Sequence, residues 1–174
     1  EIHYSDDYCP SCKQYNILGG QTVKMHNKEL AIKSLLEKNF DSDIFSHDKS
    51  VTGGCSRKRP DFLITTNWGY IVLEIDEFQH NKKTYPCQCE ITRMKEIYFD
   101  CGVKNLLFIR YNPDKYKTIE GQRPEPQLWR EEILIKIIKE KLEMGIKYLG
   151  VMYLFYDGFS RGVIEIEPID PYKA

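Results

Sequence analysis

Residues 60–75 decide the fold, and they read Pro60-Asp61-Phe62-Leu63-Ile64-Thr65-Thr66-Asn67-Trp68-Gly69-Tyr70-Ile71-Val72-Leu73-Glu74-Ile75. Two apolar segments, residues 61–64 and 70–75, are separated by a polar stretch that contains a turn at residues 67–69. Apolar runs of this length on either side of a turn are typical of two strands joined by a tight connection. We therefore predict a β-hairpin at the centre of the chain.

The next part of the chain predicts a helix followed by a buried strand. Residues 91–99 have helical periodicity and are followed by Gly102, a residue suited to a helix C-cap. The apolar run 106–111 then predicts a strand. The order strand, helix, strand favours a parallel pair with a right-handed crossover, so we expect an α/β domain whose sheet contains parallel strands.

The sequence pattern also predicts one helix before residues 60–111 and another after them. Asn27 is a candidate N-cap for a helix whose apolar residues recur up to Phe40, and residues 44–51 predict a short strand. A long helix over 128–144 and a strand over 148–156 follow a loop at 116–127, and the tail from Glu165 is expected to be peripheral. We expect residues 1–26 to be a polar N-terminal segment, a candidate zinc knuckle, and residues 27–174 to form one domain.

Composition and charge limit the possible functions. The formal net charge is −1 and the isoelectric point is about 6.5, so binding to a polyanion requires a local basic patch. No apolar run reaches the ~18 residues that a membrane span requires, and the N-terminus lacks the pattern of a signal peptide. We expect an intracellular domain, in the nucleus or cytoplasm, that is neither secreted nor bound to a membrane.

The six cysteines are distributed unevenly along the chain. Close pairs of thiolates can share one ion, so such pairs favour metal chelation over a secreted disulfide framework. The alternative is that the thiols are reduced and inert. The candidate structural Zn²⁺ ligands are the members of the two close pairs, Cys9, Cys12, Cys87 and Cys89.

Acidic residues gather where the strand over 70–75 ends. Glu74, Asp76 and Glu77 follow an apolar run, and alternation along a strand points Glu74 and Asp76 to the same side. If Asp61 lies on the neighbouring strand, three carboxylates converge on one place. Clustered carboxylates repel one another unless a cation or proton neutralises them, and oxygen ligands suit Mg²⁺ or Mn²⁺. For Glu77 the alternative is a solvated side chain.

The motif Arg59-Pro60-Asp61, followed by a strand ending in Glu74 and then by Phe78 and His80, resembles the PD-(D/E)XK restriction-endonuclease superfamily. Within it, the motif is most similar to the very-short-patch-repair branch. The resemblance covers roughly residues 27–112. It implies a restriction-endonuclease-like α/β fold, a mixed central β-sheet flanked by helices, and metal-dependent endonuclease activity on DNA, with RNA and the oligomeric state left open.

The resemblance also implies roles for individual residues. Asp61 and Glu74 would hold Mg²⁺, and His80 would be the general base, since Asp76 stands where the superfamily usually has Lys. Glu29 corresponds to an acidic residue on the first helix of the branch; its alternative is a first-turn acid that favours the helix dipole. The implied catalytic group is Asp61, Glu74, Asp76, His80 and Glu29.

A basic cluster directly precedes Asp61, where a phosphate backbone could dock. The alternative interpretation is that this basic cluster belongs to an ordinary solvated loop and binds nothing. Lys82 is a second candidate phosphate contact, and related endonuclease-like domains carry arginines where this chain has Arg93 and Arg110. The candidate nucleic-acid contacts are Arg57, Lys58, Arg59, Lys82, Arg93 and Arg110.

Two other functions are compatible with the same residues. The absence of the usual Lys is the feature that favours a catalytically inactive nuclease fold that binds nucleic acid or a protein partner. The cysteine pairs alone favour a zinc-organised interaction domain.

Overall fold

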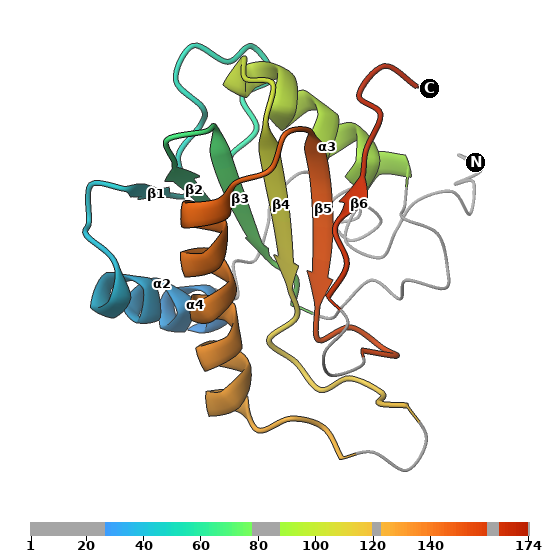
Figure 1. Ribbon diagram of the computed structural model, residues 1–174. Helices are drawn as coiled ribbons and strands as arrows, with labels where there is room; N and C mark the ends of the chain where they lie inside the picture. The colour runs from blue at the N-terminus through green and yellow to red at the C-terminus, as the bar shows by residue number, and fades with distance from the viewer. Residues whose placement is uncertain (1–26, 78–87, 120–122, 160–163, 174) are drawn as a thin grey trace, which may run out of the picture.

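The computed structural model describes residues 27–77, 88–119, 123–159 and 164–173 (Figure 1). This part of the chain is an α/β domain with a mixed sheet of six strands, in the order β1-β2-β3-β4-β5-β6, flanked by three helices. The elements are α2 (Asn27–Asn39), β1 (Phe45–His47), β2 (Phe62–Thr65), β3 (Tyr70–Ile75), α3 (Gln88–Cys101), β4 (Leu106–Tyr111), α4 (Gln127–Met144), β5 (Leu149–Leu154) and β6 (Glu167–Pro168).

The strand pairing confirms the central prediction. β2 and β3 form the expected antiparallel hairpin, and β3 and β4 form a parallel pair that α3 connects. β1 is antiparallel to β2, and β5 is parallel to β4. The tail from Glu165, expected to be peripheral, adds the short strand β6 antiparallel to β5 at the edge of the sheet.

The hairpin requires Gly69 for a steric reason. Its φ is +155°, and a Cβ at this position would lie 2.0 Å from the carbonyl oxygen of Asn105. The close approach brings the beginning of β3 to the connection before β4, where the side-chain amide of Asn105 donates to the carbonyl of Trp68 (3.1 Å). Any other residue would push the hairpin away from β4, because the atom it meets belongs to the backbone.

The sheet separates two apolar clusters. Leu36 of α2 and Leu134 of α4 pack with Phe62 and Leu73 on one face. Met94 and Ile97 of α3 pack with Val72, Phe108 and Val151 on the other. Side chains alternate along each strand, so residues of β3 and β4 with the parity of Val72 and Phe108 face α3.

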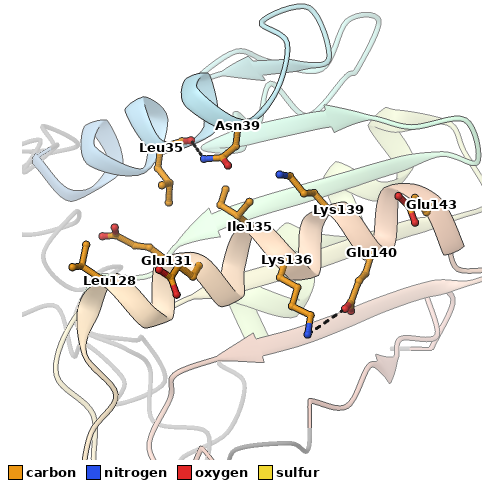
Figure 2. A pocket seen from close by; sticks show the side chains of 10 residues that line it. Leu35, Asn39, Leu128, Glu131, Ile135, Lys136, Lys139, Glu140 and Glu143 are labelled. Atoms are coloured by element: carbon orange, nitrogen blue, oxygen red, sulfur yellow. Dashed lines mark hydrogen bonds and ion pairs between the residues drawn. The ribbon is translucent and has the colours of Figure 1, made fainter.

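A groove of about 500 Å³ lies between α2 and α4 (Figure 2). Leu35 and Ile135 line it, and Lys136 pairs with Glu140 (3.9 Å) at its rim. This groove lies on the face of the sheet away from α3. None of the described helices is long and apolar enough to cross a membrane.

Candidate active site

Asp61 and Glu74 lie side by side where β2 begins and β3 ends. The hairpin register pairs Phe62 with Leu73, so the next position out on each strand places Asp61 beside Glu74. The Asp61 carboxylate accepts a hydrogen bond from the backbone N–H of Ile75 (2.7 Å), which fixes its orientation. The two acids that the sequence singled out therefore belong to one cluster.

Glu29 of α2 is the third carboxylate of this cluster. Its charge raises the pKa of Asp61, although the two residues are 32 positions apart in the chain. Oε1 of Glu29 lies 2.7 Å from Nε2 of His47, whose ring packs against Phe62 with centroids 4.9 Å apart. His47 was not predicted from the sequence. The signal was its place in the expected strand over 44–51, but the pairing of that strand with β2 was needed to use it.

The cluster carries more negative charge than its surroundings neutralise. Burial raises the pKa of Asp61 to about 8; Glu74 and Glu29 add to this, while the Ile75 N–H opposes it. Burial also raises the pKa of Glu74, against the opposing effect of Arg93. Carboxyl groups whose charged forms are disfavoured by burial and by one another need a proton or a cation.

Arg93 of α3 supplies one cation to the cluster. Its Nη2 lies 3.2 Å from Oε1 of Glu74 and also donates to the carbonyl oxygen of Arg59 (2.8 Å). Glu90, one turn before Arg93 on α3, pairs with Arg110. Arg93 therefore connects Glu74 to the segment that precedes Asp61.

Asp76 faces α3 like Glu74, and its charge raises the pKa of Glu74. The Arg110 guanidinium donates to both Asp76 oxygens (2.7 and 2.5 Å) and to Glu90 (3.0 Å), and the Tyr156 hydroxyl also donates to Asp76. Burial opposes ionisation of Arg110, but Asp76 raises its pKa. Burial and then Asp76 raise the pKa of Tyr156, which stays protonated as a donor.

This network changes two sequence-based expectations. The carboxylate that acts on Asp61 besides Glu74 is Glu29. Asp76 acts on Glu74 instead, and its oxygens are bound by Arg110 and Tyr156. Arg110 is buried and engages two acids, so its guanidinium is not placed to contact nucleic acid. The family resemblance suggested these roles, whereas in the structure Asp76, Arg110 and Glu90 connect β3, β4 and α3.

The basic cluster before Asp61 is partly paired. Lys58 lies 3.3 Å from Glu96, and Arg59 lies 3.7 Å from Asp48. Arg57 is exposed.

Several expected ligands and catalytic groups lie outside the described residues: His80, Lys82, Cys9, Cys12, Cys87 and the side chain of Cys89. Cys55 and Cys101 are free thiols.

The fit of a divalent cation can be tested on the residues present. Across the described ranges, no three His, Cys, Asp or Glu side chains are arranged to hold a metal ion as they stand. The donor chemistry of Glu29, Asp61 and Glu74 nevertheless fits Mg²⁺ or Mn²⁺, which favour carboxylate oxygens. The raised pKa of Asp61 marks the charge that such a cation would neutralise.

Comparison with protein-family models, curated proteins and solved structures gave no match to this chain.

The raised pKa of Asp61 predicts how stability depends on pH without metal. Asp61 is protonated in the folded domain up to about pH 8, whereas its ordinary pKa is 3.8. Its contribution to the free energy of unfolding is therefore full below pH 3.8 and is lost as the pH rises to about 8. Urea denaturation across this range, in a chelator, should show a steeper fall for wild type than for Asp61→Asn. Parallel pH profiles for the two proteins would contradict the assignment.

Proposed function

We propose that this chain is a metal-dependent endonuclease of the PD-(D/E)XK type, acting on DNA inside the cell, in the nucleus or cytoplasm. The observation that carries the proposal is the cluster of Glu29, Asp61 and Glu74 at one end of the hairpin, where Asp61 lies beside Glu74 in the strand register and the charges of Glu74 and Glu29 both raise its pKa. Fold stability does not require such a cluster, because buried carboxylates are costly unless they are paired. A cation-dependent reaction explains why they are together.

The proposed mechanism assigns each residue a part. Asp61 and Glu74 would hold Mg²⁺ or Mn²⁺, and Glu29 would add a third carboxylate beside them. A bound divalent cation lowers the pKa of water and stabilises charge that develops on a phosphate. The Ile75 N–H orients the Asp61 carboxylate, and His47 orients Glu29, so both acids are held before substrate binds.

His80 remains the proposed general base, on the strength of the sequence motif. A neutral imidazole has a pKa near 6.5, so it can accept a proton from an attacking water close to neutral pH. The oxygens of Asp76 are bound by Arg110 and Tyr156, so Asp76 is poorly placed to take that role.

The experiment is cleavage of supercoiled plasmid with Mg²⁺, with Mn²⁺ and with chelator. We expect nicking only with metal, and we expect His80→Ala to lower the rate by roughly 10²–10⁴-fold. The wild-type rate should fall as the pH drops below the pKa of the histidine, and the variant should lack this limb. Normal cleavage by His80→Ala would exclude the histidine as the base.

A second candidate function is a nuclease fold that binds nucleic acid without cutting it. The observation that favours it is Arg93, whose guanidinium pairs with Glu74 (3.2 Å) from the position of a motif arginine and offsets part of the charge that a metal ion would otherwise offset. The same plasmid assay separates the two, because this candidate requires binding and no nicking with either metal.

A further inference from the structure

Asp100, near the end of α3, anchors the chain that leads to Asp61. Its carboxylate accepts hydrogen bonds from the backbone N–H groups of Cys55 (2.8 Å) and Ser56 (3.1 Å), and from the Ser56 hydroxyl. A side chain at Gly54 would collide with it, because a Cβ there would lie 2.6 Å from Cγ of Asp100. Burial works to raise the pKa of Asp100, but these hydrogen bonds hold it below its ordinary value. The carboxylate of Asp100 is therefore ionised and is held by hydrogen bonds from Cys55 and Ser56.

From this anchor the segment follows α3 toward the carboxylate cluster. Lys58 pairs with Glu96, about one turn before Asp100, and the Arg59 carbonyl accepts from Arg93, one turn earlier still. Successive turns of α3 thus hold the segment 55–59 along the helix. It belongs to the blue-green connection between β1 and β2 in Figure 1.

Arg57 differs from the other basic residues of this segment. Its side chain is exposed and makes no hydrogen bond or ion pair within the residues that the structure describes, whereas Lys58 and Arg59 each lie near an acid. Its φ is +58°, a costly conformation for a residue with a Cβ. Such strain persists only where the surroundings impose it, and Arg57 directly follows Cys55 and Ser56, whose backbone N–H groups are bound to Asp100.

We propose that the nucleic-acid backbone runs from the carboxylate cluster along segment 55–59, that Arg57 contacts one of its phosphates, and that Asp100 is the positioning residue. This rests on the proposed function. A cluster of carboxylates repels a polyanion, so neighbouring cations must attract it. Among the cations of segment 55–59, Arg57 forms no ion pair with an acid of the described residues, whereas Lys58 and Arg59 each lie near one. An extended chain of four residues spans at most about 14 Å, so Arg57 lies within roughly four nucleotide steps of Asp61.

The test measures binding of a short fluorescent DNA duplex by anisotropy over a range of salt concentrations, with Ca²⁺ replacing Mg²⁺. Arg57→Gln should weaken binding several-fold and lower the slope of log affinity against log salt by about 0.9, the value of one phosphate contact. Lys38→Gln is the matched control, since this exposed lysine lies on α2, on the other face of the sheet. It should leave affinity and slope unchanged.

Asp100→Ala separates positioning from a general loss of structure. It should weaken binding as much as Arg57→Gln does, and the double variant should be no weaker than either, because both act through one contact. Additive losses of affinity in the double variant would overturn the role of Asp100. An unchanged salt slope in Arg57→Gln would overturn the proposed path of the DNA backbone along segment 55–59. A wild-type protein that binds no duplex would overturn it too. If wild type cleaves DNA but the salt slope of Arg57→Gln is unchanged, the proposed path of the DNA backbone is wrong and the nuclease proposal stands. If wild type does not cleave DNA but Arg57→Gln lowers the salt slope, the nuclease proposal is wrong and the path of the backbone stands.

Discussion

Asp61→Asn should abolish metal-dependent cleavage, lowering its rate by about 10³-fold or more. The carboxylate charge is lost at the centre of the cluster, and metal stabilisation of the developing phosphate charge is worth several kcal/mol, at about 1.4 kcal/mol for each factor of ten. The asparagine oxygen can still accept the Ile75 N–H, so the fold should be retained. Because the variant also removes a buried acid whose pKa is raised to about 8, it should unfold at no lower urea concentration than wild type above neutral pH.

The control for this variant is Asp43→Asn, the same change at an exposed acid between α2 and β1. Its cleavage rate should stay within about twofold of wild type, as expected for a surface change away from the site. Glu74→Gln should reproduce the loss seen for Asp61→Asn. Substantial activity in both carboxylate variants would mean that the cluster is not the active site.

Arg110→Met should strongly destabilise the domain. The side chains of Asp76 and Glu90 are only 12% and 10% exposed, and without Arg110 both lose the guanidinium that pairs with them. Removing one partner from a buried ion network costs about 3–5 kcal/mol. The free energy of unfolding, measured with urea, should fall by that amount.

Two further variants test whether the loss of stability comes from the buried ion network. Arg57→Met makes the same change at an exposed arginine and should alter the free energy of unfolding by less than about 0.5 kcal/mol. Adding Asp76→Asn and Glu90→Gln to Arg110→Met should recover most of the loss, because neither carboxylate is then left charged without its partner. A small effect of Arg110→Met would show that water already screens this network.

Local sequence patterns predicted the elements that local interactions determine. The hairpin over 61–75 and the strand at 106–111 follow from runs of apolar residues interrupted by turn residues, and both are present. Asp61 and Glu74 followed from the same reasoning, since a hairpin register places residues at its open end next to each other. The short strand β6 was missed because two residues carry no periodicity.

The parts that were not predicted depend on tertiary placement. Glu29 influences Asp61 only because α2 packs across the sheet, and the contact of His47 with Glu29 requires β1 to pair with β2. The pairing of Asp76 with Arg110 depends on the parallel register of β3 and β4, which sets Glu74 opposite Arg110. Side-chain alternation gives the face of a strand, but it does not reveal which partner from another element reaches that face.

Titration with Mn²⁺ tests most directly whether Glu29, Asp61 and Glu74 form one cation site. Calorimetry at pH 7 in buffers of different ionisation enthalpy measures both binding and proton release. We predict saturable binding by wild type with release of protons, because the pKa of Asp61 is raised to about 8 and metal must displace its proton. Asp61→Asn should bind far more weakly and release fewer protons. Absence of saturable binding by wild type, or equal binding and proton release by Asp61→Asn, would contradict the account.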